Sequence, residues 1–425
     1  MHSRTPDPAP SRRDAIKTLS AAAGAALLTG GARADASTGS ARTASGAHAG
    51  RDDGYLLGDG VIYLNHASIG TAPARVLAAR DELARAVEAN PWLHVWAGAW
   101  DERIAEARRT VAAYLGTEPR RLAMVRTTTD AMNTLAQGLG LGPGDEVLCS
   151  SLNHVGATAC FEHHGRRRGY TVRRFDFPVL DAPSLTPGDV VRIYADQIRD
   201  NTRLLVFPHV DNIIGLRYPV RALAVEARRR GVEFVACDGA QAAGMMPVEV
   251  DALGVDFYAI SAHKWLQSPK AVGLAVFTDT LIERVEPMVV TWGQNSWDDA
   301  RRFEDWGTHD PAAWPVLREA VEHQASLGTP GALFERRMAL RARVRERCAS
   351  NAGFWYRSPG HPDLGTPIAA VEVEGIPSAE VFDRLRRRGY VFRAFREQGL
   401  DTCRVSVNAM NTAAEIDGFF AHARG

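Results

Sequence analysis

The sequence lacks an excess of either charge, paired cysteines and a long hydrophobic run. Lys and Arg together number 50, and so do Asp and Glu, so the basic excess typical of nucleic-acid-binding proteins is missing. The five cysteines form no CxxC pair and have no histidine partner at metal-ligand spacing. The apolar stretch over residues 19–28 is too short to anchor the chain in a bilayer. We therefore expect no nucleic-acid partner, no metal site and no membrane span.

The chain does contain enough apolar sequence for a large core. Hydrophobic residues make up 45% of 425, and this length fits one large domain with a smaller one. Over residues 146–277, short apolar or β-branched runs alternate with helical stretches, which predicts an α/β fold with a mostly parallel sheet flanked by helices. A long helical stretch over 312–348, followed by strands near 368–373 and 404–407, predicts a smaller α+β domain. We expect the N-terminal segment and large domain to cover 52–305 and the small domain 306–425.

The first 34 residues predict a cleavable signal peptide. Arg12 and Arg13 precede the short apolar stretch, and Ala32 and Ala34 supply an A-x-A pattern. The paired arginines resemble a twin-arginine (Tat) signal, so we expect export to a periplasmic or extracellular location. Residues 35–51 are rich in Ala, Gly, Ser and Thr, which predicts a flexible leader. In an exported protein, a disulfide among the five cysteines stays an open alternative.

Lys264 follows the apolar strand predicted over 256–260. A lysine at a strand end near the core is costly unless its amine is paired or chemically used. Burial lowers the pKa of a lysine, and the neutral amine is the form that attacks an aldehyde. The position therefore suits covalent catalysis, while a surface lysine in a loop is the ordinary alternative.

Polar residues suited to binding a cofactor also follow another predicted strand and begin a predicted helix. Asp238 and Gln241 follow the buried strand predicted over 234–237, where a carboxylate can keep a pyridine nitrogen protonated and an amide can donate to a ring oxygen. Residues 126–130 begin a helix with three threonines, and the N–H groups of a helix start bind phosphate. Taken singly, Asp238 and the threonines are also explained as plain helix caps.

These segments together resemble the class V aminotransferases of pyridoxal 5′-phosphate (PLP) fold type I. The likeness rests on DGAQ at 238–241, HKW at 263–265 and Gly273, and it extends over most of the chain. The opening segment over 63–70, the phosphate-binding turn over 126–133 and HVDN at 209–212 match the family pattern, as do FEDWGTHDP at 303–311 and Arg404. The resemblance implies a PLP enzyme with its site at the interface of a homodimer.

The resemblance implies a role for each matching position. Lys264 would hold PLP as a Schiff base and carry the Cα proton, Asp238 would pair with the pyridine nitrogen, and His154 would stack on the ring. Arg404 would bind the substrate carboxylate, which suits a planar guanidinium. Thr308 would reach the phosphate of the partner subunit. The rest of the expected cofactor-binding set is Thr128, Thr129, Asn212, Gln241, Ser261 and His263.

The opening segment and the 303–311 stretch most resemble the isopenicillin N epimerase-like branch. We therefore expect epimerisation, elimination or amino-group transfer at the Cα of an amino acid or a peptide-linked amine. Residues 390–399 contain no cysteine, whereas cysteine desulfurases of the family carry one on a mobile loop there, so desulfuration through a persulfide is disfavoured. A PLP-dependent oxidase-type tailoring enzyme and a non-catalytic PLP-binding protein stay open as alternatives.

Overall fold

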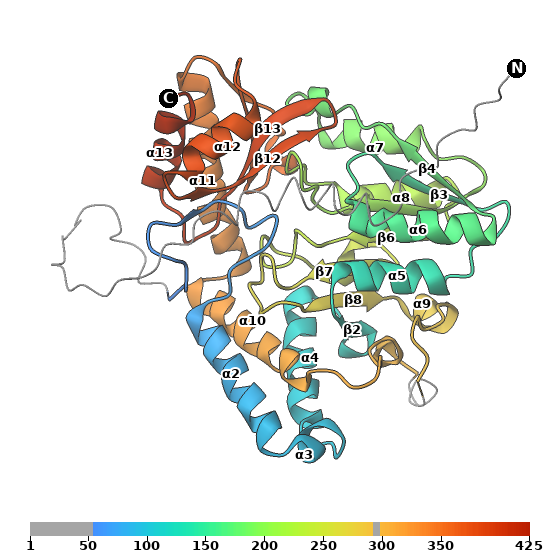
Figure 1. Ribbon diagram of the computed structural model, residues 1–425. Coiled ribbons are helices and arrows are strands. Elements are labelled where there is room, and N and C mark those ends of the chain that lie inside the picture. The colour runs from blue at the N-terminus through green and yellow to red at the C-terminus, as the bar shows by residue number, and fades with distance from the viewer. Residues whose placement is uncertain (1–53, 292–297) are drawn as a thin grey trace, which may run out of the picture. The chain divides into compact units, whose positions relative to one another are not determined.

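The computed structural model describes residues 54–291 and 298–425 (Figure 1). The predicted signal peptide and leader lie outside the described residues. No helix in the described part of the chain is long and apolar enough to cross a membrane.

A seven-stranded sheet forms the centre of the fold, as the alternating pattern predicts. Strand β8 is antiparallel to both of its neighbours, β2 and β7, whereas the other neighbouring pairs are parallel. The carboxyl ends of β3, β5, β6 and β7 therefore meet at one edge of the sheet. In spatial order the strands are β2 (Leu122–Val125), β8 (Gly273–Phe277), β7 (Phe257–Ser261), β6 (Phe234–Asp238), β5 (Thr202–Pro208), β3 (Glu146–Ser150) and β4 (Thr171–Phe175).

Helices cover both faces of this sheet because its strands are apolar on both sides (Figure 1). In β5, Leu205 and Phe207 join one core, and Leu204 and Val206 join the other. The first core is completed by α4 (Asp101–Leu115), α7 (Pro187–Ala195), α8 (Val220–Arg229) and α10 (Val316–Leu327). The second is completed by α5 (Thr128–Gly138), α6 (Val155–Arg168) and α9 (Asp279–Arg284). The result is a three-layer α/β/α arrangement.

A second sheet of four antiparallel strands has its own core. Its apolar residues pack against α11 (Pro330–Ser350), α12 (Ser378–Arg386) and α13 (Ala413–Ala423). The strand order is β12 (Arg393–Glu397), β13 (Leu400–Ser406), β10 (Ile368–Val373) and β9 (Phe354–Tyr356). This antiparallel sheet with its helices matches the α+β pattern predicted for the C-terminal part.

The long helical stretch expected over 312–348 consists of two helices, α10 and α11. Gly328, with a φ of 142°, ends α10 in a conformation that favours glycine. The side chain of Thr329 then accepts a hydrogen bond from the Ala332 N–H, and Pro330 occupies the first turn of α11. Helix α10 packs beside α4 and α2 (Ala74–Ala89), and α3 (Pro91–Val95) follows α2.

The N-terminal segment contacts both sheets. Strand β1 (Ile62–Tyr63) pairs in parallel with β11 (Tyr390–Val391), and the Ala67 N–H donates to Ser406 Oγ at 3.0 Å. Further along, the Gly70 N–H donates to the carbonyl of His263 at 3.0 Å. The segment therefore connects the end of β13 to the turn that carries Lys264.

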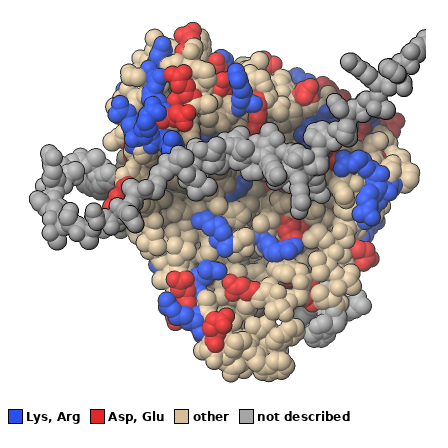
Figure 2. All heavy atoms as spheres, viewed as in Figure 1, with Lys and Arg blue, Asp and Glu red and all other residues tan. Residues whose placement is uncertain are grey.

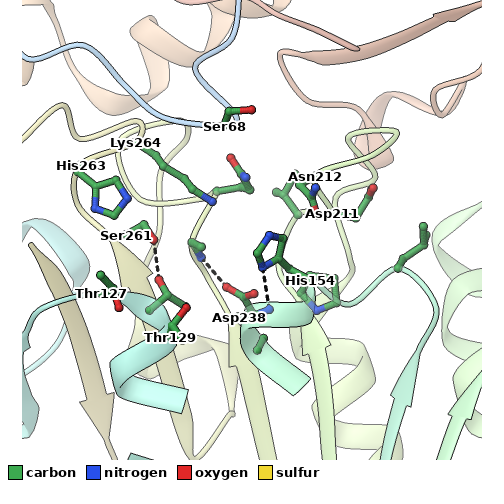
Figure 3. Close-up of a pocket in the computed structure, with 18 residues that line it drawn as sticks. Ser68, Thr127, Thr129, His154, Asp211, Asn212, Asp238, Ser261, His263 and Lys264 are labelled. Carbon is green, nitrogen blue, oxygen red and sulfur yellow. Dashed lines mark hydrogen bonds between the residues drawn. The ribbon is translucent and has the colours of Figure 1, made fainter. Parts of the chain in front are cut away.

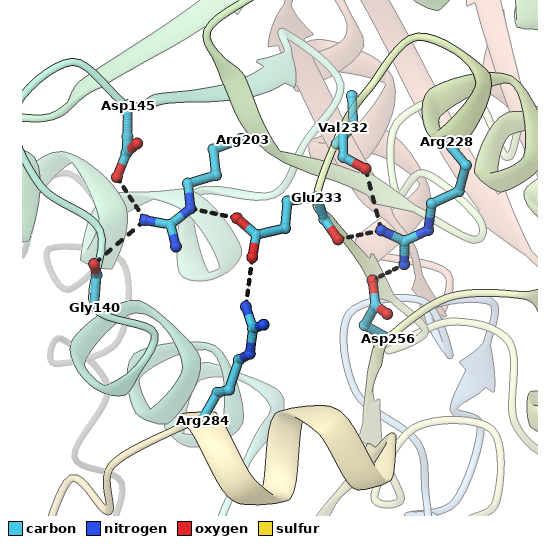
Figure 4. A network of polar contacts seen from close by, with 8 residues as sticks. All are labelled: Gly140, Asp145, Arg203, Arg228, Val232, Glu233, Asp256 and Arg284. Carbon is cyan, nitrogen blue, oxygen red and sulfur yellow. Dashed lines mark hydrogen bonds and ion pairs between the residues drawn. The ribbon is translucent and has the colours of Figure 1, made fainter.

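An ion-pair network lies at the amino ends of the parallel strands, on the side of the seven-stranded sheet away from their carboxyl ends (Figure 4). Glu233 pairs with Arg203 at 2.7 Å and with Arg284, and Arg203 also reaches Asp145 at 2.9 Å. Asp145, Arg203 and Glu233 lie at the starts of strands, away from their carboxyl ends, and Arg284 is the last residue of α9. On the face shown in Figure 2, basic and acidic side chains are intermingled, in keeping with the balanced composition.

Candidate active site

A cavity of about 220 Å³ opens at the carboxyl ends of the parallel strands (Figure 3). Ligands bind at this edge in open α/β sheets, because loops there diverge and leave a crevice. All the predicted site residues line the cavity except Thr308 and Arg404. The lining set is Ser68, Thr127, Thr128, Thr129, Leu152, His154, Gly156, Ala157, Pro208, Val210, Asp211, Asn212, Asp238, Ala240, Gln241, Ser261, His263 and Lys264.

Lys264 lies in the turn after β7 and extends its amine into the cavity (Figure 3). Burial lowers the pKa of the amine to about 8, and the nearby Arg404 and Arg393 act in the same direction. The Asp238 carboxylate opposes this shift. A substantial neutral fraction near physiological pH makes this lysine suited to attack an aldehyde.

Asp238 is the last residue of β6, and its side chain is buried at the cavity wall. One carboxylate oxygen accepts the Ala240 N–H at 3.0 Å, which fixes its orientation. Gln241 lies close by, donating to the Ala67 carbonyl and accepting from the Trp265 indole N–H, both at 2.8 Å. These bonds lock the strand end that bears the carboxylate to the turn that bears Lys264.

The start of α5 forms another part of the wall. The Thr127 hydroxyl caps the helix by accepting the Asp130 N–H at 3.1 Å, and the Thr128 hydroxyl lies 2.7 Å from Ser261 Oγ. Thr127, Thr129 and His263 also line the cavity. Hydroxyls beside the free N–H groups of a helix start suit an anionic group such as a phosphate.

Two glycines allow close packing around the start of α5. A Cβ at Gly156 would lie 2.9 Å from Thr129 Oγ1 and 3.0 Å from His154 Nδ1. A Cβ at Gly273 would lie 2.6 Å from the carbonyl carbon of Thr127. Because these positions have no side chain, the start of α5 packs closely against the start of α6 and against β8.

His154 lies just before α6 and presents its ring to the cavity (Figure 3). Its Nδ1 accepts the Gly156 N–H at 3.0 Å, so the ring proton is on Nε2. Burial lowers the pKa of this imidazole, and the positive charge of Lys264 lowers it further. A neutral, flat ring with a fixed tautomer is suited to stacking on a cofactor.

Asp211 and Asn212 complete the cavity wall after β5. Asp211 Oδ1 accepts the N–H groups of Ile213 at 2.7 Å and Ile214 at 2.8 Å, and burial raises the pKa of its carboxyl to about 6. The backbone carbonyl of Asn212 accepts from Arg404 at 2.8 Å. These hydrogen bonds fix the backbone of the turn that follows β5.

Arg404 lies behind the wall rather than on it. Its guanidinium is fully buried and also donates to Asn65 Oδ1 at 2.8 Å and to Ser68 Oγ. Ser68 and Asn212, its two partners at the cavity, separate it from the open space. Thr308 is exposed and does not line the cavity in this chain.

Sequence reasoning missed Ser68, Thr127 and Asp211 as lining residues. Each adjoins a segment that was recognised, and each had a visible signal. Thr127 is the N-cap of the helix that begins at Thr128, and Asp211 precedes Asn212 after the same strand. Ser68 belongs to the opening segment, whose position over the cavity depends on its long-range contact with Ser406.

A lysine amine, a buried carboxylate, an aromatic ring and a helix start around one cavity fit the aldehyde, pyridine ring and phosphate of PLP. The chain belongs to the aminotransferase class-V family, whose model matches residues 62–419. PLP is the cofactor typical of this family, and the chain is a class-V aminotransferase-like enzyme.

Two kinds of protein are similar to this chain in sequence. The chain is 35% identical to isopenicillin N epimerase of Amycolatopsis lactamdurans over 332 residues, 73% of this chain and 82% of that protein. It is 27% identical to a probable cysteine desulfurase of Halobacterium salinarum over 351 residues, 79% of this chain and 82% of that protein.

Solved structures share the fold. A structure of C-DES with glycine covalently linked to its PLP cofactor matches with a TM-score of 0.77 at 21% identity, covering 84% of this chain and 95% of that one. The cysteine desulfurase CsdA of Escherichia coli matches with a TM-score of 0.75 at 23% identity, covering 87% and 95%. At these identities the likeness establishes the architecture.

Proposed function

We propose that this enzyme acts at the Cα of an amino acid or a peptide-linked amine, with Lys264 as the residue that holds PLP and moves the Cα proton. The observation that carries the proposal is the convergence of the Lys264 amine and the Asp238 carboxylate on one cavity. When bound, PLP supplies an electron sink for the bond that breaks at Cα. The reaction is epimerisation, elimination or amino-group transfer.

Each residue then has a task that follows from its surroundings. Asp238, held by the Ala240 N–H, keeps the pyridine nitrogen protonated. His154 is uncharged and covers the ring, while the α5 start with Thr128, Thr129, Ser261 and His263 binds the phosphate. Asn212 and Gln241 approach the ring hydroxyl. Arg404 orients the substrate carboxylate after Ser68 and Asn212 move away from its guanidinium group.

Epimerase-like chemistry is favoured over persulfide-forming desulfuration. The greater identity to isopenicillin N epimerase points in this direction. Residues 390–399, where the desulfurases carry a cysteine, span β11, β12 and the turn that leads into β13. There Glu397 pairs with Leu400, leaving only Gln398 and Gly399 as a tight turn. Cys403 is buried, and burial raises the pKa of its thiol, so it is a poor nucleophile.

Export and dimerisation belong to the same proposal. A Tat-type signal would carry the folded enzyme, with its cofactor, to a periplasmic or extracellular location. A homodimer would bring Thr308 to the cofactor phosphate of the partner subunit, and its exposure in this chain is compatible with that role.

The test incubates the purified enzyme with L-amino acids and short peptides in D₂O, with a Lys264→Ala variant beside it. We expect visible absorbance of bound cofactor in the wild type, and deuterium at Cα or a fragmented product with at least one substrate. The variant should lack the absorbance of the lysine–cofactor Schiff base before substrate is added, and it should neither label nor fragment any substrate. Label alone identifies an epimerase, a lost fragment a lyase, and a keto acid a transaminase. Oxygen uptake would instead indicate the oxidase-type alternative, and cofactor absorbance without any turnover would indicate a PLP-binding protein.

A further inference from the structure

Two arginines occupy directly opposite positions on neighbouring strands at the edge of the second sheet. Arg393 of β12 is paired in register with Arg404 of β13. Both guanidinium carbons lie over the ring of Phe395, at 4.2 Å and 5.0 Å from its centroid. Like charges directly opposite each other on a sheet are destabilising. The presence of such a destabilising pair therefore points to a function for its positive charge.

The groups around this pair leave its charge largely uncompensated. Glu397 lies 3.7 Å from Arg393, but both side chains are about half exposed, at 48% and 45%, so this pair is weak. Asp211 faces Arg404, yet its oxygens already accept backbone N–H groups. The Nε of Arg404 is buried without a hydrogen-bond partner among the described residues.

The exposed member of the pair, Arg393, carries its positive charge near the active site. The charge of Arg393 lowers the pKa values of Lys264, His154 and Arg404, which places it within electrostatic reach of the cavity. Arg393 and Phe395 project from the same face of β12, because side chains alternate along a strand. Phe395 packs into the core that also contains Phe207 and Val210, and Val210 lines the cavity.

The hairpin that carries Arg393 is held in place. Its two turn residues, Gln398 and Gly399, have φ values of 56° and 75°, as the tight turns that match strand twist require. The Gln398 side chain donates to the Ser151 carbonyl at 3.2 Å, next to Leu152 of the cavity wall. Arg393 therefore projects from a fixed support.

We propose that Arg393 is a specificity-determining residue that pairs with an anionic group on the substrate side chain. The preferred substrates are then amino acids, free or peptide-linked, with a second carboxylate besides the one at Cα. This inference rests on the proposed function, in which Arg404 orients the first carboxylate. In the absence of substrate, Glu397 pairs with Arg393. When the substrate binds, its anionic side-chain group replaces Glu397 in this pair.

The test measures binding to the cofactor-loaded enzyme by calorimetry, with two probe pairs that differ in charge but hardly in shape. The pairs are L-aspartate with L-asparagine and L-glutamate with L-glutamine. In at least one pair, we expect the wild type to bind the acid about tenfold more tightly than its amide, as one charge-assisted hydrogen bond provides. Arg393→Gln should bring the two affinities within about threefold by weakening the acid alone.

Two further variants separate this role from a general effect of charge. Glu397→Gln should strengthen binding of the acid, because it releases Arg393. Arg396→Gln removes a charge from the same hairpin, where the side chain is 85% exposed and paired with Asp401, and should leave the preference unchanged. The proposal is overturned if the wild type shows no preference for the acid in either pair, or if Arg393→Gln retains it. Failure of the proposed function would appear separately, as missing cofactor absorbance in every variant.

Discussion

The Thr128 and Ser261 hydroxyls lie 2.7 Å apart and join the start of α5 to the end of β7. They are 133 residues apart in the sequence, and Lys264 follows Ser261 by one turn of chain. The contact therefore sets the distance between the helix start that suits a phosphate and the lysine that suits an aldehyde.

Ser261→Ala should weaken retention of the cofactor without unfolding the protein. The substitution removes one hydroxyl from the phosphate end of the cavity, a loss of about 0.5–1.5 kcal/mol, or roughly two- to tenfold in affinity. Cofactor dissociation during dialysis measures the effect. Ser184→Ala, which alters an exposed serine bonded to the Asp181 carbonyl, is the matched control. Equal retention in both variants would contradict the role given to Ser261.

The rate of PLP uptake by cofactor-free enzyme should rise with pH, reach half its maximum near pH 8 and level off about one pH unit higher. Burial lowers the pKa of the Lys264 amine from 10.5 to about 8, so the neutral amine reaches half its full amount there instead of above pH 10. Stopped-flow absorbance between about pH 6.5 and 10.5 follows the reaction. A profile that keeps rising to pH 10 would mean that the amine is not shifted.

Glu304→Gln should destabilise the enzyme far more than Glu233→Gln. Glu304 is buried, pairs with Arg108 through both oxygens and accepts the Met124 N–H at 2.6 Å. Breaking a buried pair leaves an uncompensated charge and costs about 3–5 kcal/mol. Glu233 is 40% exposed in the network of Figure 4, so its loss should cost about 1 kcal/mol or less. Urea unfolding monitored by circular dichroism compares the two, and similar midpoints would refute the distinction.

Gly70→Ala should disrupt the active site, because the added Cβ would lie 1.9 Å from the Lys264 carbonyl oxygen. The segment over the cavity would have to move, and we expect cofactor affinity to fall at least about tenfold, consistent with the cost of forced backbone shifts in packed regions. Spectroscopic titration with PLP provides the measurement. Gly142→Ala, where a Cβ meets nothing within 4 Å, should bind PLP normally. Normal binding by Gly70→Ala would show that the close approach is not required.

Much of the fold could be predicted because its strands are short apolar runs bounded by polar residues. The strand predicted over 234–237 is β6, which ends one residue later, and the strand predicted over 256–260 is β7, which is shifted by one residue. Strand β2 was missed because four apolar residues directly after a short helical turn have no distinctive period, and its place is set by pairing with β8. Helix α7 was also missed, although Thr186 and Asp189 form a capping box that the sequence displays.

The site residues at the ends of strands in the seven-stranded sheet could be predicted from the sequence. Asp238, Asn212 and Lys264 follow parallel strands, and the carboxyl ends of such strands necessarily meet. Arg404 and Thr308 belong to segments placed by tertiary packing, which no local pattern reveals. The buried position of Arg404 behind Ser68 follows from how the second sheet and the opening segment pack together, and the local sequence does not determine that packing.

The opening segment has a consequence for biosynthesis. Ala67 and Ser406, which hold it in place, are 339 residues apart in the chain. Contacts with such a separation form late, because the entropy of closing a long loop must be overcome first. A growing chain at the ribosome can complete the large sheet early, yet it lacks the cover over the cavity until β13 has emerged. Stable capture of the cofactor is therefore an event of the finished polypeptide, and translation stalled before residue 406 should yield a folded sheet that releases PLP.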